Sequence, residues 1–509
     1  MDFELNFVKY YDAALENKKF LLIYFLLVGV LTLSIVSIDN VSHPVMEVII
    51  FILTIVLGVF SILYYILHDS ELHKVAFVII ICFGLITAFL TPIAIVPDET
   101  EHMVRSELTS SGVLIPEPQF VNNTFSGFNT IKSAVDLTND QGNTVFTSNI
   151  DNVKIDHTKT IYSSAFMQNP FFGYLAQAIG ILLAKLLDLN VIWMLWLGRI
   201  ANLILYAFLI SRAVKKSPVL KIPLIVMACM PLAIFQAASF SIDVMINGLA
   251  FIIIGYFLFM LKSEDNSIDL KDLCIFSILA LLCGLCKVPY LALIFLIFVI
   301  PKNKFKTPFY YNFVAFLIVS ILGLLWTKFY ATPNYIFSYR ADYFIANNVS
   351  MQGQINYLSN HLLSTIVTYA NSFNFIYYMF AGLYSFSMVE FSYESQLLTL
   401  FGLLFMGAII FLYPNKLEIS TKSRIGVLIV ALIIFIGTFT IQLLTWTSVG
   451  KLYDVSLQPR YFIPLFALLP FVFGLNNNAS EDEKINKFIM IMVMVLLSGF
   501  SILTVCRFY

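Results

Sequence analysis

Residues 75–102 read VAFVIIICFGLITAFLTPIAIVPDETEH, an uncharged apolar run that leads directly into an acidic motif. About 20 consecutive apolar residues are enough for one helix to cross a lipid bilayer. The run over 75–96 therefore predicts a membrane span. Its end would present Asp98 and Glu99 at the membrane surface, where both carboxylates can meet water.

The rest of the chain repeats this apolar character. It has 509 residues, of which 59% are hydrophobic and only 12% are charged, whereas a soluble protein carries about 25% charged residues. So few charges cannot cover a water-soluble particle, and the composition predicts an all-α polytopic membrane protein. The net charge of −1 leaves no basic surface for nucleic acid. The six cysteines lie in apolar segments, so no disulfide framework is expected.

Hydropathy predicts about 13 membrane spans. Two of them share the stretch 272–301, where Lys287 and Pro289 interrupt the apolar run and indicate two short helices that meet near one membrane face. The remaining predicted spans are 20–38, 46–67, 75–96, 191–211, 222–240, 244–261, 309–330, 396–413, 425–447, 461–475 and 488–506.

Lysine and arginine concentrate in cytoplasmic loops, and this rule orients the spans. With the N-terminus inside, the short inner loops hold most of the basic residues, and two large segments, 97–190 and 331–395, lie outside the cytoplasmic membrane. A span over 171–189 would reverse this distribution, so an interfacial or re-entrant helix is expected there. The predicted organisation is an N-terminal cytoplasmic segment with two extra spans over 1–74, a core over 75–475, and a cytoplasmic loop with a last span over 476–509.

The acidic motif offers the first candidate for chemistry. Asp98 and Glu99 are adjacent, and His102 follows one helical turn later. One carboxylate could take a proton from an attacking hydroxyl group, or the three side chains could hold a divalent metal such as Mg or Mn. The structural alternative is a solvated acidic cap where a helix meets water.

Other rare charged residues fall at the same outer face. Asp243 lies between two spans, Lys287 lies at the break of the 272–301 hairpin, and Arg460 opens the span at 461. Arg199 lies in the outer half of its span. A charge at the centre of a membrane helix costs at least about 2.5–3.5 kcal/mol, so such residues usually face the bundle interior or a water-filled cavity.

Each of these charges also has a structural explanation. Asp243 could cap the following helix, Arg199 and Lys287 could extend to the headgroups, and Arg460 could anchor the interface together with Tyr461. Taken together, acids and cations on one membrane face predict an outward-facing cleft. Its carboxylates would activate an acceptor hydroxyl group, and its cations would bind an anionic leaving group such as phosphate.

Several of these motifs resemble known membrane families. The acidic pair, Asn169-Pro170 before a juxtamembrane helix, the Arg199–Asn202 segment and the Asp243 turn are similar to the GT-C superfamily of glycosyltransferases. A closer resemblance, over roughly 75–475, is to a bacterial membrane family labelled domain of unknown function 2142. It is carried by Pro97-Asp98-Glu99-x-x-His102, Lys287-Val-Pro-Tyr290 and Gln458-Pro-Arg460-Tyr461-x-x-Pro464.

The resemblance implies a GT-C-like fold and a glycosyltransferase that acts outside the cytoplasmic membrane. It would take a sugar from a polyprenyl-phosphate donor and pass it to a glycan or lipid acceptor of the cell envelope. The catalytic residues would be Asp98, as the base, and Glu99. The other implied site residues, which would bind substrate, are His102, Arg199, Asp243, Lys287, Tyr290, Gln458, Arg460 and Tyr461.

Two other functions fit a chain with many spans and intramembrane charges. One is a transporter or flippase of lipid-linked saccharides, which would need charges along a path across the membrane. The other is a polymerase or a non-catalytic assembly subunit, because the two large outer segments suit either role. The one-sided clustering of the charged residues favours the transferase.

Overall fold

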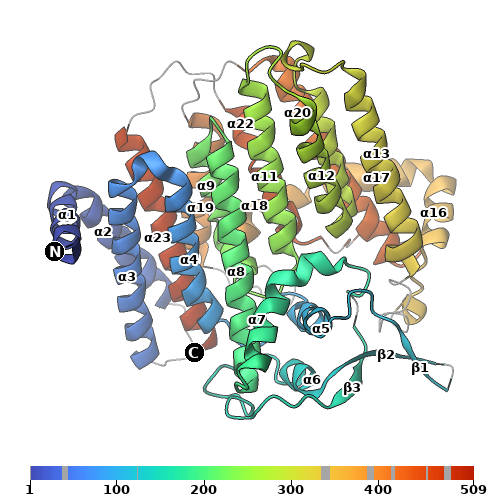
Figure 1. Cartoon of the computed structure of the whole chain (residues 1–509), viewed down its shortest axis with the longest axis horizontal. Coiled ribbons are helices and arrows are strands. Elements are labelled where there is room, and N and C mark those ends of the chain that lie inside the picture. Colours follow the sequence, from blue (N-terminus) through green and yellow to red (C-terminus); the bar gives the residue numbers. More distant parts are fainter. Residues whose placement is uncertain are drawn as a thin grey trace.

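The computed structural model describes residues 2–36, 44–122, 124–164, 166–333, 344–386, 395–413, 419–453, 455, 457–474 and 483–509. The described chain is mostly helical (Figure 1). Eight helices are long and apolar enough to cross a membrane. They are α2 (Lys18–Val36), α3 (Pro44–Leu67), α4 (Leu72–Leu90), α8 (Val191–Lys216), α11 (Asp243–Lys262), α13 (Tyr310–Trp326, continued by η5, Thr327–Ala331), α20 (Thr421–Thr445) and α23 (Glu483–Phe508).

The other predicted spans are shorter or broken, so the described chain shows eight long apolar helices where the sequence predicted about 13 spans. Proline accounts for two of the breaks, because it has no backbone N–H and cannot continue a regular helix. The segment 222–240 divides into α9 (Lys221–Ala228) and α10 (Pro231–Ala237). The segment 461–475 divides into η7 (Pro459–Phe462), α21 (Ile463–Phe466) and α22 (Leu469–Phe473).

The hairpin at 272–301 has the predicted interruption. Its first half is α12 (Leu270–Cys286), its second half is η3 (Val288–Phe298), and Lys287 joins them in an extended conformation. The segment at 396–413 forms α19 (Gln396–Leu412), which is slightly shorter than a typical span. Residues 171–189 form η2 (Phe171–Tyr174) and the 12-residue α7 (Leu175–Leu186), which is too short to cross a bilayer alone.

Helix α8 lies at the centre of one half of the bundle, with α4, α7 and α11 packed along it (Figure 1). The contact with α7 is close because Gly180 has no side chain. A Cβ atom at this position would lie 2.2 Å from the carbonyl oxygen of Leu197. A glycine of α8, Gly198, makes room for the ring of Phe240 in the same way. The contact at Gly180 holds α7, near the end of the first outer segment, against the bundle.

The first outer segment corrects the all-α expectation. After α5 (Glu99–Ser110), the strands β1 (Gln119–Val121), β2 (Thr124–Ile131) and β3 (Lys159–Tyr162) form an antiparallel sheet in the order β1-β2-β3, with α6 (Lys132–Asn139) beside it. The sheet lies beyond one end of the helix bundle (Figure 1). Its strands are short and follow one another in a polar stretch, so the hydropathy that identifies spans does not reveal them.

The second outer segment is helical where it is described. It contains α16 (Met351–Asn360), α17 (Leu362–Ser372), α18 (Phe375–Ala381) and the short η6 (Gly382–Tyr384). Parts of the predicted segment 331–395 lie outside the described residues. The remaining short elements are α1 (Asp2–Glu16), η1 (Asp69–Glu71) and η4 (Lys302–Lys304).

The basic loops lie together at the end of the bundle away from the sheet (Figure 1). Lys304 Nζ donates a hydrogen bond to the Ser263 carbonyl oxygen at 2.6 Å, and Arg424 Nη1 donates one to the Val472 carbonyl oxygen at 2.8 Å. Lys216 Nζ lies 3.3 Å from the ring centroid of Phe259. The short basic loops and the large outer segment therefore occupy opposite ends of the bundle, as the charge distribution predicted for the two sides of a membrane.

Candidate functional site

Asp98 begins the site at an unusual backbone conformation. Its φ is 61° and its ψ is 15°, in the left-handed region, which asparagine and aspartate adopt more readily than most residues. Helix α5 starts at the next residue, and the His102 amide donates a hydrogen bond to the Asp98 carbonyl oxygen at 3.1 Å. As a result, the neighbouring carboxylates of Asp98 and Glu99 meet different partners.

Arg460 connects three distant parts of the sequence. Its Nη2 atom donates to Asp98 Oδ2, and its Nη1 atom donates to Asp243 Oδ2 at 3.3 Å and to the Pro97 carbonyl oxygen at 3.2 Å. The Nε atom donates to Gln458 Oε1 at 2.5 Å. The predicted convergence of Asp98, Asp243, Gln458 and Arg460 is therefore present. One guanidinium thus contacts two carboxylates, those of Asp98 and Asp243.

Lys287 lies beside this cluster. Its Nζ atom is 3.5 Å from the ring centroid of Tyr461, within the range of a cation–π interaction. The Cζ atom of Arg460 is 5.2 Å from the same centroid. Tyr290 holds the backbone of Tyr461, because its hydroxyl group donates to the Tyr461 carbonyl oxygen at 2.7 Å. Two cations thus share one aromatic ring. We call Asp98, Asp243, Lys287, Gln458, Arg460 and Tyr461, with Tyr290, the Arg460 cluster.

Exposure differs sharply within the Arg460 cluster. The side chain of Asp98 is 30% exposed, whereas those of Asp243 and Arg460 are 7% and 3% exposed. Asp98 is therefore the carboxylate of this cluster that a molecule from outside can reach most easily. Asp243 lies behind it, at the first residue of α11, where a negative charge is also favoured by the helix dipole.

Glu99 belongs to a separate site formed with Arg199. The two side chains are fully buried, and Arg199 donates two hydrogen bonds, from Nε to Glu99 Oε1 at 2.8 Å and from Nη2 to Oε2 at 2.6 Å. Arg199 also donates to backbone carbonyl oxygens at the end of α4, and the Phe240 amide donates to Glu99 Oε1 at 3.2 Å. We call this arrangement the Arg199 pair.

His102 has a third environment. Its Nδ1 atom lies 2.8 Å from the hydroxyl oxygen of Tyr174, which also accepts a hydrogen bond from Asn169 Nδ2 at 2.8 Å. The imidazole stacks on Phe166 with a centroid distance of 4.4 Å. Tyr174 was not identified from the sequence. An aromatic residue at the edge of an apolar helix has no signal that separates it from ordinary packing.

These three environments bear on the metal site that the acidic motif suggested. The side chains of Asp98, Glu99 and His102 contact Arg460, Arg199 and Tyr174, respectively. Among the residues that the structure describes, no group of three His, Cys, Asp or Glu side chains could hold a metal ion. The three motif residues therefore do not fit a shared metal site in this arrangement.

A further buried ion pair lies in the outer segment and was also missed. Lys185 Nζ donates to Glu107 Oε1 at 2.7 Å, and the side chains are 10% and 0% exposed. Burial raises the pKa of Glu107, but Lys185 and the hydroxyl groups of Thr130 and Ser111 outweigh this effect and hold the pKa below its ordinary value. The pair fixes α7 against α5, the helix that follows Asp98.

Comparison with known proteins adds a family. The family model for predicted membrane proteins known as DUF2142 matches residues 81–469. No curated protein and no solved structure matches the chain. The match covers more than half of the chain and includes the whole Arg460 cluster and the Arg199 pair. The chain therefore belongs to the DUF2142 family.

Proposed function

We propose that this DUF2142 membrane protein is a glycosyltransferase that moves a sugar from a polyprenyl-phosphate donor to an envelope glycan or lipid. The observation that carries the proposal is the Arg460 cluster. It combines a partly exposed carboxylate, Asp98, with two cations, Arg460 and Lys287, at one end of the helix bundle. A reaction that removes a proton from a hydroxyl group and releases a phosphate needs this combination.

The two kinds of charge have separate roles in the proposal. Asp98 accepts the proton of the acceptor hydroxyl group as its oxygen attacks the anomeric carbon of the donor. The bond from that carbon to the phosphate oxygen breaks, and the electron pair leaves with the polyprenyl phosphate. Arg460 and Lys287 stabilise the phosphate charge, a role that suits the two donor edges of a guanidinium. A single displacement of this kind inverts the configuration at the sugar carbon.

In the proposal, the contact between Arg460 and Asp98 explains why the donor binds before Asp98 acts as the base. An arginine that is hydrogen-bonded to a carboxylate lowers the basicity of that carboxylate. A donor phosphate at Arg460 competes with Asp98 for the same guanidinium. Donor binding therefore frees Asp98 to act as a base only when the leaving group is in place. Asp243 remains behind Arg460 and keeps part of its charge compensated.

The other members of the acidic motif have supporting roles. Glu99 has a fully buried side chain bound to Arg199, so it positions the turn that carries Asp98 and does not contact substrate. His102 is held by Tyr174 and Phe166 one turn into α5 and fixes the orientation of that helix. No step of the proposed reaction requires a metal ion.

The proposed orientation puts the Arg460 cluster outside the cytoplasmic membrane and the N-terminus inside. Support comes from the ends of the bundle, because the basic loops lie at the end opposite the sheet and α5, the helix that starts directly after Asp98 (Figure 1). A polyprenyl-phosphate donor would then present its phosphate at headgroup depth, with its tail in the bilayer.

The test is the envelope glycan of a deletion strain that carries either the wild-type gene or Asp98→Asn. We expect Asp98→Asn to leave the glycan as in the deletion strain, with a transfer rate at least about 10²-fold below wild type, while the variant is present in the membrane at normal levels. The matched control is Asp188→Asn, which changes an outer-segment aspartate whose side chain is 77% exposed. A wild-type glycan from Asp98→Asn would refute the assigned base.

Purified protein in proteoliposomes separates the alternatives. Transfer of sugar from a polyprenyl-phosphate donor to a soluble acceptor supports the transferase. Movement of a lipid-linked saccharide across the bilayer without a new glycosidic bond would instead indicate a transporter or flippase. Products that grow by whole repeat units would indicate a polymerase.

A further inference from the structure

A second site lies at the other end of the bundle, far along the chain from the acidic motif. A groove of about 780 Å³ runs between η3 and α20. Its floor includes Gly426, where a Cβ atom would lie 2.9 Å from Val299 Cγ2, so the absence of a side chain on α20 lets the two elements approach closely. The residues that line the groove include Phe295, Phe298, Lys302, Lys422, Ile429 and Ile433.

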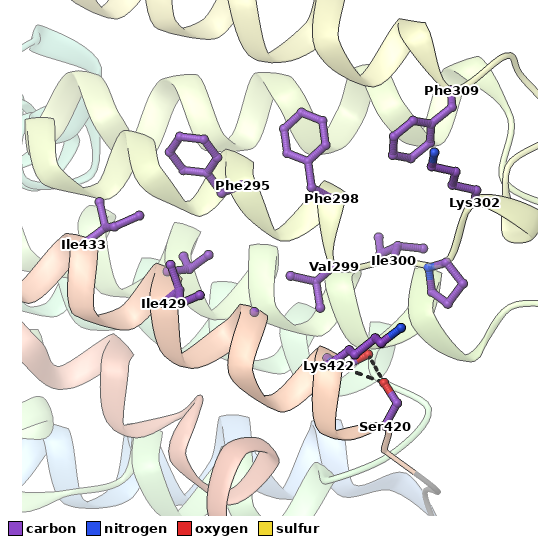
Figure 2. Close-up of a pocket in the computed structure, with 14 residues that line it drawn as sticks. Phe295, Phe298, Val299, Ile300, Lys302, Phe309, Ser420, Lys422, Ile429 and Ile433 are labelled. Atoms are coloured by element: carbon purple, nitrogen blue, oxygen red, sulfur yellow. Dashed lines mark hydrogen bonds between the residues drawn. The ribbon is translucent and has the colours of Figure 1, made fainter.

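The lining is divided into a polar end and an apolar end. Figure 2 shows Lys302 on one side of the groove and Lys422 and Ser420 on the other, all toward one end, whereas Phe295 and Ile433 lie at the opposite end. Lys302 Nζ is 4.8 Å from the ring centroid of Phe309. Within the part of the chain that the structure describes, neither lysine of the groove forms an ion pair. A groove with cations at one end and only hydrocarbon beyond them fits an anionic amphiphile.

The position of the groove on α20 fixes its depth in a membrane. Helix α20 is a candidate span that begins at Thr421, so Lys422 lies at the boundary where headgroups meet water. Ile433 lies eleven residues further along the helix, which corresponds to about 16 Å at 1.5 Å per residue. This is about half of a hydrocarbon core of roughly 30 Å. The groove therefore has the length of one leaflet.

The apolar end is open to the bilayer. The side chains of Ile429 and Ile433 are 51% and 42% exposed on a helix that is apolar enough to cross a membrane. A lipid tail can therefore enter the groove from the side, while its headgroup stays between Lys302 and Lys422. An ordinary acyl chain has the length of one leaflet, whereas a long polyprenyl chain does not.

From these observations we infer that the groove binds an anionic glycerophospholipid. Its phosphate contacts Lys302, Lys422 and Ser420, and one acyl chain lies along Phe298 and Ile429. The inference does not depend on the proposed transferase activity, because it concerns another part of the molecule and another ligand.

The test is retention of phospholipid by the purified full-length protein in native mass spectrometry. Phosphatidylglycerol and phosphatidylethanolamine with identical acyl chains are compared, and we expect phosphatidylglycerol to be retained preferentially. A lysine near an anionic headgroup contributes a factor of about 5 in affinity. Lys302→Gln and Lys422→Gln should each lower retention of phosphatidylglycerol about 5-fold, and the double variant about 25-fold.

The matched control is Lys271→Gln. Lys271 is exposed, and the loop that precedes it pairs with the 302–306 segment through hydrogen bonds such as that from the Asn266 amide to the Asn303 carbonyl oxygen, yet it does not line the groove. This variant should retain phosphatidylglycerol like wild type. A second variant, Ile429→Trp, fills the groove and should reduce retention of both lipids while the protein elutes normally in size-exclusion chromatography.

Three outcomes of the retention measurements would overturn the inference. They are equal retention of the two lipids by wild type, unchanged retention by the double lysine variant, and a loss in Lys271→Gln as large as in the groove variants. Displacement of phosphatidylglycerol by inorganic phosphate alone would also overturn it, because the site would then recognise a free anion and not a lipid.

Discussion

The Arg460 cluster and the Arg199 pair are built from adjacent residues of one motif, yet they differ in almost every physical respect. Asp98 is 30% exposed and shares its arginine with a second carboxylate. Glu99 is fully buried and has its own arginine, which is further held by three backbone carbonyl groups. The left-handed conformation of Asp98 separates the two side chains.

The difference shows how one motif can serve both structure and chemistry. A buried, fully hydrogen-bonded ion pair cannot exchange partners without exposing a charge to a medium of low dielectric constant. A partly exposed ion pair can exchange partners, because water or a ligand replaces the lost contact. The Arg199 pair is therefore suited to hold the turn in place, and the Arg460 cluster is suited to bind and release an anion.

The largest expected effect on stability comes from breaking the Arg199 pair. Glu99→Leu leaves the Arg199 charge buried without its carboxylate, and this should lower the free energy of unfolding by about 3–5 kcal/mol. The measurement is the thermal midpoint of the purified protein in detergent. Asp98→Asn, in the partly exposed position next to it, should change stability by less than about 1 kcal/mol.

A double variant makes this comparison sharper. Glu99→Leu combined with Arg199→Met removes both buried charges and should recover much of the lost stability, because apolar side chains can replace a buried pair at little cost. If Glu99→Leu is as stable as wild type, or if Asp98→Asn is the less stable of the two single variants, the contrast between the two sites is wrong.

The loss of stability on breaking the ion pair of Glu107 and Lys185 should fall between these extremes, and it should depend on pH. Glu107→Gln removes a buried charge-assisted contact and should cost about 2–3 kcal/mol near neutral pH. The pKa of Glu107 is lower in the folded protein than in the unfolded chain, so its stabilisation is complete above the ordinary value of 4.5 and is lost as the pH falls through the folded pKa.

Thermal midpoints of wild type and Glu107→Gln should therefore converge as the pH is lowered below 4.5. The control is Glu117→Gln, an exposed position in the same outer segment, which should match wild type at every pH. A gap between wild type and Glu107→Gln that is constant with pH would show that the lost stability does not come from the ionised carboxylate.

A small loss of stability is expected from a change at the hydrogen bond that supports the Arg460 cluster. Tyr290→Phe removes the hydrogen bond to the Tyr461 carbonyl oxygen and should cost about 1 kcal/mol. Tyr377→Phe, at a side chain that is 66% exposed, is the control. Because Tyr461 lies next to both cations, Tyr290→Phe should also weaken donor binding more than it changes stability. An unchanged Michaelis constant for the donor would contradict this positioning role.

The main features of the site were predictable from charge and hydropathy. Asp243, Lys287 and Arg460 are rare charges in apolar surroundings, and such residues are costly unless they have partners. The break at Lys287 was also predictable, because Pro289 follows two residues later. The proline breaks in the 222–240 and 461–475 segments were not anticipated, because hydropathy averages over a window and does not register where a helix ends.

The roles of Glu99 and Arg199 could not be predicted. The sequence presents Asp98 and Glu99 as equivalent acids, and their different burial depends on a backbone angle and on helices that lie about a hundred residues away. Tyr174 and the pair of Glu107 and Lys185 were missed for the same reason. Their partners are distant in the sequence, and no local spacing marks them.

Composition and the spacing of apolar runs by themselves determined that this chain enters a membrane and at which end its rare charges gather. These properties follow from the transfer of side chains between water and lipid, which depends on each residue and its near neighbours. Only the tertiary structure decided which carboxylate meets which arginine. Ion pairing acts over a few ångströms, and the folded backbone alone brings residues separated by hundreds of positions within that range.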